Sequence, residues 1–286
     1  MTIQEATYFI LNKLRTIYAD GEASQITDWV MEYITGSKKA ERMIYKNSTI
    51  TDKEEHQLQH FMKRLMEHEP VQYVLNEAWF CGFKFYVDRN VLIPRPETEE
   101  LVVWVISDTR TRKEPLQILD IGTGSGCIPI TLKKKLPAAE IASCDISKGA
   151  LEVAQKNADR LGAEILFIHV DFLKKEEWKQ LPSVDIIVSN PPYVPEKDRE
   201  QMQPNVLHYE PHTALFVPDN DALVFYSAII DFAKDHLKAN GAIYLEIHED
   251  LGAQASALFQ SAGYKIELKK DLQGKNRMIV ASLQSQ

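Results

Sequence analysis

Cysteine is scarce in this sequence, and the few cysteines that occur are not paired by spacing. Cys81, Cys127 and Cys144 are the three cysteines among 286 residues, and no two of them form a Cys-x-x-Cys motif. An odd number of unpaired cysteines is not typical of a disulfide framework, which secreted proteins use and reduced compartments disfavour. The pattern therefore favours a reduced interior, and we expect a cytoplasmic protein.

Several other signals are missing as well. Residues 1–20 lack a basic segment followed by an apolar core, and no hydrophobic run is long enough to span a membrane. The sequence also has no Gly-x-Ser-x-Gly elbow, no phosphate-binding P-loop and no low-complexity tract. These absences argue against a signal peptide, a membrane partner, a serine hydrolase and a P-loop nucleotidase.

An excess of basic residues is missing too. The chain has 33 Lys and Arg against 41 Asp and Glu, which gives a net charge of −8. Residues 1–80 have nine basic and twelve acidic residues, a balance of −3. A protein that binds nucleic acid over a broad surface needs clustered Lys and Arg to neutralise phosphates. We therefore expect no direct sequence-specific binding to nucleic acid.

Histidine and acidic pairs offer no convincing metal site. His56 and His60 lie on one helical face that solvation explains, and Pro211 interrupts the helix that would align His208 with His212. Glu246 and His248 share a face at the end of an apolar run, where they could line a pocket, but we favour packing or surface exposure for both. We predict that the protein binds no metal.

Length and hydrophobic pattern indicate a large α/β domain with a smaller partner. Hydrophobic residues make up 44% of the chain and charged residues 26%, as in ordinary globular proteins. We predict a helical bundle for substrate recognition over residues 1–75, in which Thr51 and Glu54 form a capping box. A β-hairpin linker over 76–95 and a catalytic domain over 96–286 follow. We expect a monomer.

The catalytic domain shows a repeated strand–helix pattern. Such alternation predicts a Rossmann-like sheet of parallel strands with right-handed crossovers. The last two predicted strands have no helix between them, so we expect one of them to be antiparallel at the sheet edge. The seven predicted strands are residues 116–120, 140–145, 165–170, 185–189, 242–247, 264–268 and 277–283.

The most informative stretch is the apolar run 185–189 followed by Asn190, Pro191, Pro192 and Tyr193. The two prolines cannot continue a ladder, so the strand ends in a stiff loop where open α/β sheets bind ligands. The Asn190 side-chain oxygen and the Pro191 carbonyl could accept both N–H bonds of a planar NH2 group. Tyr193 could stack on that group. Catalysis would then depend on placement and oriented dipoles.

A second pattern predicts a nucleoside site. The first strand is followed by Gly122, Thr123, Gly124, Ser125 and Gly126. This spacing is Gly-x-Gly-x-Gly, whereas dinucleotide-binding folds use Gly-x-Gly-x-x-Gly. Acidic and aromatic residues end the next two strands, where they could contact ribose hydroxyls and adenine. These residues are Asp145 and Phe172.

The combined motifs resemble a class I S-adenosylmethionine methyltransferase that methylates amino groups. Residues 93–99 (Ile-Pro-Arg-Pro-Glu-Thr-Glu), residues 70–73 and the helical module resemble more narrowly the PrmC/HemK family, the glutamine methyltransferases of peptide chain release factors. The resemblance implies methylation of the glutamine in a Gly-Gly-Gln loop. It also implies a seven-stranded sheet, S-adenosylmethionine as donor and S-adenosylhomocysteine as product.

The same resemblance implies roles for individual residues. The loop 122–126 would hold the methionine part of the donor, Asp145 its ribose and Phe172 its adenine. Residues 190–193 would hold the glutamine amide, and Asn190 would contact the donor as well. Two alternatives stay open at this point. The first is an N6-adenine methyltransferase of nucleic acid that uses the same loop, and the second is a module that binds S-adenosylmethionine without turnover.

Overall fold

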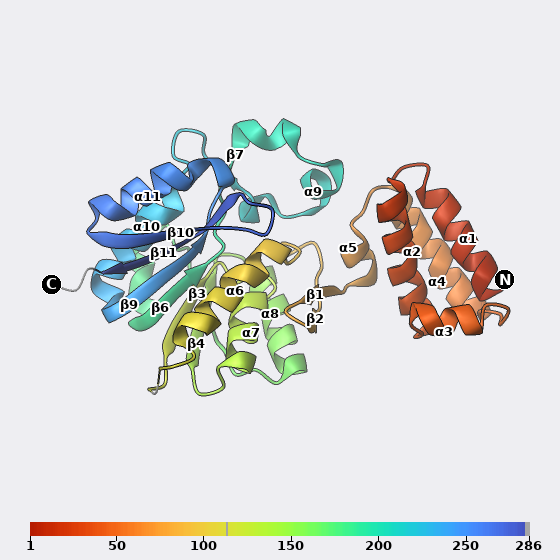
Figure 1. Cartoon of the computed structure of the whole chain (residues 1–286), viewed down its shortest axis with the longest axis horizontal. Coiled ribbons are helices and arrows are strands. Elements are labelled where there is room, and N and C mark those ends of the chain that lie inside the picture. Colours follow the sequence, from red (N-terminus) through yellow and green to blue (C-terminus); the bar gives the residue numbers. More distant parts are fainter. Residues whose placement is uncertain (113, 284–286) are drawn as a thin grey trace. The chain divides into compact units, whose positions relative to one another are not determined.

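The chain folds into two compact units (Figure 1). The structure is a computed structural model that describes residues 1–112 and 114–283. The first unit contains Met1–Glu77 together with Gln203–Tyr209, and the second contains the rest of the described chain. The hairpin that the sequence suggested as a separate linker is part of the second unit, because Phe80 and Phe85 are buried in its core. The segment Gln203–Tyr209 was not expected in the first unit.

The first unit is helical, as the sequence predicted. Its helices are α1 (Ile3–Leu14), α2 (Asp20–Thr35), α3 (Lys39–Ile44), α4 (Asp52–Met66), α5 (Val71–Leu75) and α9 (Pro204–Tyr209). The predicted capping box is confirmed, since the Thr51 side chain accepts from the Glu54 amide and the Glu54 carboxylate accepts from the Thr51 amide. The box satisfies amides at the start of α4 that have no partner within the helix.

Apolar helix faces form the core of this unit. Ile10, Leu14, Val30 and Leu58 are all completely buried. Each such side chain contributes roughly 1.5–3 kcal/mol relative to an exposed position. The Tyr209 hydroxyl, at the end of α9, donates a 2.6 Å hydrogen bond to a backbone carbonyl of the same unit. This bond attaches the later segment to the bundle.

The second unit is built on a seven-stranded sheet. Its strands, in the order β10-β11-β9-β6-β3-β4-β5 across the sheet, are β10 (Tyr264–Lys270), β11 (Asn276–Leu283), β9 (Leu237–Glu246), β6 (Val184–Ser189), β3 (Gln117–Ile121), β4 (Glu140–Asp145) and β5 (Leu166–His169). β11 is antiparallel to both of its neighbours, and the pairs from β9 to β5 are parallel. The predicted antiparallel strand is present but lies one place inside the edge, because β11 inserts between β10 and β9.

Helices cover both faces of this sheet (Figure 1). One face packs against α6 (Pro96–Thr109), α7 (Cys127–Lys135) and α8 (Lys148–Leu161), and the other against α10 (Val224–His236) and α11 (Gly252–Ser261). Successive strand residues point to opposite faces of the sheet. Ile186 therefore packs in the core beneath α6, α7 and α8, and Ile187 in the core beneath α10 and α11. Burial on both faces explains why the strands read as continuous apolar runs.

Short elements complete the second unit. The hairpin of β1 (Ala78–Phe80) and β2 (Phe83–Phe85) is confirmed, with Cys81 and Gly82 at positive φ in its turn. The remaining elements are β7 (Val194–Pro195), β8 (Phe216–Val217), η1 (Lys175–Gln180), η2 (Glu196–Gln201), η3 (His212–Ala214) and η4 (Glu249–Leu251).

Candidate functional site

A cavity of about 350 Å³ lies where the carboxyl ends of β3, β4, β5 and β6 meet. Parallel strands bring these ends to one edge of the sheet, so loops far apart in sequence become neighbours. Most of the residues that the sequence singled out line this cavity: Gly122, Thr123, Gly124, Ser125, Asp145, Phe172, Asn190, Pro191 and Pro192. Gly126 and Tyr193 are not among the lining residues.

The glycine loop shapes the first wall. Gly122 and Gly124 have φ values of +80° and +52°, a conformation that L side chains rarely adopt. Gly126, at the start of α7, has φ +78° and serves packing in addition. A Cβ there would lie 2.8 Å from Ile130 Cδ1 and 3.2 Å from Ala154 Cβ. The loop therefore depends on glycine for its turn and for the close approach of α7 and α8.

Asp145 connects the end of β4 to this loop. Its Oδ2 accepts a 3.0 Å hydrogen bond from the Gly124 amide, and its Oδ1 accepts one of 2.8 Å from the Ser147 amide. Burial raises the pKa of the Asp145 carboxyl, and the backbone amides oppose this shift. Each oxygen keeps a further lone pair, so the carboxylate can also accept from hydroxyls of a ligand.

Unsatisfied hydroxyls lie beside the same wall. Thr123 Oγ1 and Ser125 Oγ are buried and have no hydrogen-bond partner among the described residues. Behind them, Asp120 is completely buried and accepts a 2.6 Å hydrogen bond from Ser143 Oγ. Burial raises the pKa of Asp120 to about 7. Buried polar atoms without partners are uncommon in folded proteins, and here they indicate a polar ligand at the loop.

Phe172 belongs both to the cavity wall and to the core. Its ring lies 5.6 Å from that of Trp178 and 5.4 Å from that of Phe232, measured between ring centroids. The Trp178 indole also donates to the Phe172 carbonyl at 2.8 Å. The ring is therefore held in place where it lines the cavity, as a flat apolar surface.

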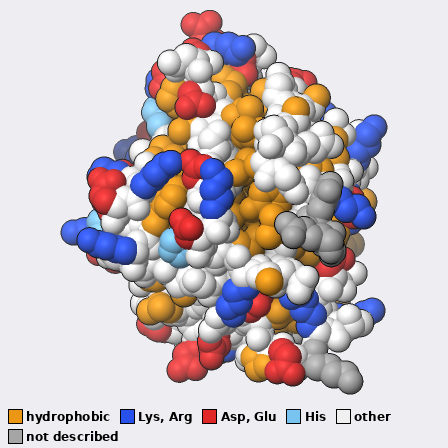
Figure 2. Space-filling view, turned by 90° about the vertical axis from the view of Figure 1, so that its left-hand side faces the viewer, with side chains coloured by type: hydrophobic (Ala, Val, Ile, Leu, Met, Phe, Trp, Pro, Cys, Tyr) orange, Lys and Arg blue, Asp and Glu red, His pale blue; other side chains and the backbone are white. Residues whose placement is uncertain are grey.

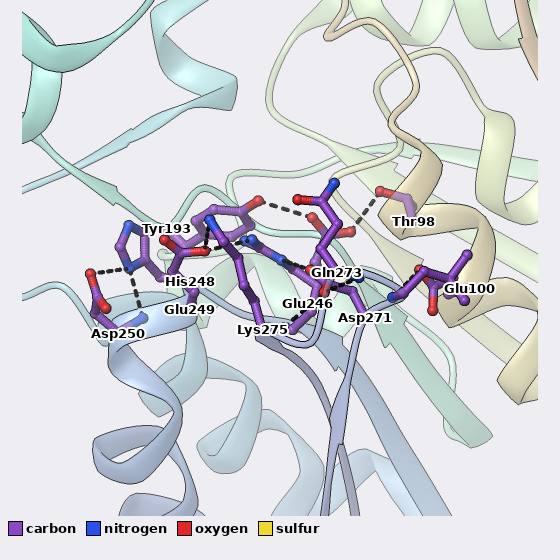
Figure 3. Close-up of polar contacts among 12 residues, drawn as sticks. Thr98, Glu100, Tyr193, Glu246, His248, Glu249, Asp250, Asp271, Gln273 and Lys275 are labelled. Atoms are coloured by element: carbon purple, nitrogen blue, oxygen red, sulfur yellow. Dashed lines mark hydrogen bonds and ion pairs between the residues drawn. The ribbon is translucent and has the colours of Figure 1, made fainter.

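Asn190 also lines the cavity, and a hydrogen-bond chain fixes its side chain. Its Nδ2 donates to Thr98 Oγ1 at 3.0 Å. Thr98 in turn donates to Glu246 Oε2 at 2.6 Å, and Tyr193 OH donates to Glu246 Oε1 at 2.9 Å. Figure 3 shows the Glu246 carboxylate between Thr98 and Tyr193.

Tyr193 is held at its hydroxyl end. Its hydroxyl donates to Glu246, and its ring packs edge-on against His248 at 6.0 Å. Burial and the nearby Glu246 carboxylate raise the pKa of Tyr193 well above its ordinary value. The expected stacking of its ring on a substrate group stays a prediction.

A partly buried ion pair joins the loop of residues 93–99 to Glu210. Arg95 Nη2 lies 2.6 Å from Glu210 Oε1, and the Ile93 amide donates to Glu210 Oε2 at 3.1 Å. The side chain of Glu210 is 1% exposed. Arg95 and Pro211 both line the cavity, so this pair holds two walls together.

Sequence reasoning missed four of these residues: Arg95, Thr98, Glu210 and Glu246. The stretch 93–99 was used only as part of the family resemblance, with no individual role for Arg95 or Thr98. Glu246 was interpreted as a packing or surface residue, and it is buried with both carboxylate oxygens engaged. A carboxylate directly after the apolar residues of β9 was the available signal, but its proximity to Asn190 depends on the pairing of β9 with β6.

The described residues contain neither a candidate metal site nor a candidate membrane-spanning helix. No group of three or more His, Cys, Asp and Glu side chains there could hold a metal ion. No described helix has the length and apolar character needed to cross a membrane.

Comparison with known proteins shows the family. A model for the PrmC N-terminal domain matches residues 10–75, and one for the Methyltransferase small domain matches residues 101–209. The release factor glutamine methyltransferase of Flavobacterium psychrophilum is 40% identical over 282 residues, which are 98% of each chain. The chain belongs to the release factor glutamine methyltransferase family. A second member, from Bacteroides thetaiotaomicron, is 37% identical over 96% of this chain and 98% of its own.

Solved structures agree with this family's fold. A methyltransferase from Pyrococcus furiosus superimposes with a TM-score of 0.51 at 16% identity, covering 71% of this chain and 89% of its own. The predicted fold class is therefore confirmed: a class I, Rossmann-like methyltransferase sheet preceded by a helical unit. The family assignment also confirms the resemblance that residues 93–99 and the Asn-Pro-Pro-Tyr loop suggested.

Proposed function

We propose that this protein transfers a methyl group from S-adenosylmethionine to the side-chain amide nitrogen of the glutamine in the Gly-Gly-Gln motif of peptide chain release factors. The observation that carries the proposal is the placement of Asn190 and Pro191 on the same cavity as the glycine loop and Asp145. Relatives named as release factor glutamine methyltransferases support the choice of substrate.

The residues along the glycine loop fit the donor. Thr123 and Ser125 offer buried hydroxyls without partners, which suit a charged amino-acid tail. Asp145 can accept from ribose hydroxyls, and Phe172 offers a fixed ring for adenine. A cavity of about 350 Å³ lies within the ordinary range of small-molecule sites. Bound there, S-adenosylmethionine would supply a sulfonium methyl group as the electrophile.

The Asn-Pro-Pro-Tyr loop fits the acceptor. The nitrogen of a carboxamide is a poor nucleophile, because its lone pair is delocalised into the carbonyl. Asn190 Oδ1 and the Pro191 carbonyl can accept both of its N–H bonds, which orients the lone pair and stabilises the positive charge that develops on nitrogen. The N–CH3 bond would form as the S–CH3 bond of the donor breaks, S-adenosylhomocysteine would leave, and the nitrogen would lose one proton to solvent. The prolines stiffen the loop, so little reorganisation is needed when the substrate binds.

The same chemistry would suit the amino group of adenine, but charge argues against nucleic acid. On the face that Figure 2 shows, Lys and Arg side chains are interspersed with Asp and Glu. A nucleic-acid track needs a continuous run of basic side chains along the phosphates. The chain total of −8 agrees with this view.

A labelling experiment tests the proposal. The purified protein is incubated with methyl-labelled S-adenosylmethionine and an unmethylated release factor, and the modified residue is located by peptide mass spectrometry. We expect one methyl group on the glutamine of the Gly-Gly-Gln motif. A release factor with that glutamine replaced by alanine and a single-stranded oligonucleotide are the controls. Label in the oligonucleotide, or in neither macromolecule, would refute the proposal.

A further inference from the structure

A chain of hydrogen bonds with a fixed direction ends at Asn190. Burial raises the pKa of Glu246, and hydrogen bonds from Thr98 and Tyr193, one at each oxygen, oppose this rise and favour the carboxylate. A carboxylate can only accept. The Thr98 hydroxyl has a single hydrogen, which the 2.6 Å bond to Glu246 uses. Thr98 Oγ1 can therefore only accept from Asn190, which must turn its NH2 group toward Thr98.

This direction decides which end of the Asn190 amide faces the ligand. The amide has a donor end and an acceptor end, and a rotation of half a turn exchanges them. With Nδ2 held by Thr98 at 3.0 Å, Oδ1 occupies the other position. Asn190 lines the cavity, so the oxygen is the end left to accept from a bound NH2 group. In the opposite orientation Oδ1 would face the Thr98 oxygen with no hydrogen between them, and the NH2 group of Asn190 would face the NH2 group of the ligand.

The sheet explains why these residues meet. Ser189 in β6 pairs with Leu245 in β9, so Asn190 and Glu246 leave neighbouring strands side by side. Thr98 comes from the first turn of α6, which packs against β9. Thr98 and Glu246 are 2% and 1% exposed, so water does not compete for their hydrogen bonds.

We infer that Thr98 and Glu246 are positioning residues for methyl transfer, which hold the Asn190 amide with its oxygen toward the substrate nitrogen. The inference rests on the proposed function, because it specifies how the acceptor side of that site is aligned. Neither residue needs to contact the substrate, and Glu246 does not line the cavity.

The test compares isosteric substitutions in one helix. Thr98→Val removes the hydroxyl with almost no change of shape, and Thr98→Ser restores it. Thr109→Val is the matched control, because Thr109 is also buried in α6 but its hydroxyl bonds to carbonyls of its own helix, those of Val105 and Ile106. Single-turnover rates with saturating S-adenosylmethionine and release factor are measured, together with donor affinity by calorimetry and the thermal midpoint.

We expect Thr98→Val to reduce the methyl-transfer rate on the order of 10- to 100-fold, as loss of alignment does. Donor affinity should stay within about twofold, and Thr98→Ser should recover most of the rate. Thr109→Val should keep the wild-type rate. An unchanged rate for Thr98→Val, or an equal loss for Thr109→Val, would overturn the inference.

A double-mutant cycle shows whether Thr98 acts through Asn190. In an Asn190→Ala background there is no amide to align, so Thr98→Val should cause no further loss. A full additional loss in that background would overturn the inference. Failure of the wild-type enzyme to label glutamine would instead refute the proposed function, so the two failures are distinguishable.

Discussion

Gly126→Ala tests the close packing at the glycine loop. The φ of +78° costs an alanine roughly 1–2 kcal/mol, because its Cβ crowds the backbone in this region. The new Cβ would also lie 2.8 Å from Ile130 Cδ1 and 3.2 Å from Ala154 Cβ. Overpacking of this kind costs about 1–3 kcal/mol. We expect a total destabilisation of about 2–5 kcal/mol, the sum of these two ranges.

Gly162→Ala separates the two contributions. Gly162 ends α8 with φ +62°, and no atom lies within 4 Å of its Cβ position. It should therefore show only the backbone cost of roughly 1–2 kcal/mol. The two variants are compared by urea unfolding without ligand, and a difference of ~2 kcal/mol moves the midpoint by on the order of 1 M.

A second substitution checks the steric explanation. Ile130→Val removes the Cδ1 atom that the new methyl group would meet. Alone it should cost about 0.5–1.5 kcal/mol, because Ile130 is completely buried. In the Gly126→Ala background it should cost less or restore stability. Equal losses for the two glycine variants, or additive effects of Gly126→Ala and Ile130→Val, would refute this account of the loop.

Three further predictions concern the cavity and its electrostatics. Asn190→Ala should lower the methyl-transfer rate far more than Thr98→Val does, to a residual rate that single-turnover measurement still resolves, while donor affinity, measured by calorimetry, stays largely unchanged; an equal loss of donor binding would contradict its role. Asp145→Ala should chiefly weaken donor binding, and an unchanged dissociation constant would exclude the ribose contact. The buried Asp120, whose pKa is raised to about 7, holds a proton that the unfolded chain loses above about pH 4, so its contribution to stability is lost as pH rises through 7. The stability of Asp120→Asn relative to wild type should therefore increase as pH rises from 4 to 7, by up to about 1.4 kcal/mol per pH unit. Urea titrations of both proteins at several pH values measure this difference, and a difference that does not change with pH would refute the explanation.

The features that could be predicted from the sequence are those that depend on residues close together in the chain. The glycines of the loop 122–126, the prolines after Asn190 and the acid at the end of β4 each have a local physical reason. Their placement around one cavity followed from the expected parallel sheet. The capping box of Thr51 and the hairpin of β1 and β2 were predictable in the same way.

The features that could not be predicted depend on the order of the strands in the sheet. The position of β11 between β9 and β10 cannot be read from a period or a motif, because all three sequences are ordinary strands. For the same reason the contact of Tyr193 with Glu246 was not predicted, because the two residues are more than fifty positions apart in sequence and become adjacent only in the folded sheet.

The inserted strand has a consequence for how the protein is made. A nascent chain that has emerged only as far as residue 275 contains β10 but lacks β11, which pairs with both β9 and β10. Met278 of β11 is the register partner of Glu246. The end of β9 therefore has no neighbour on that side until β11 has left the ribosome, and alignment of the acceptor side should be one of the last events of biogenesis.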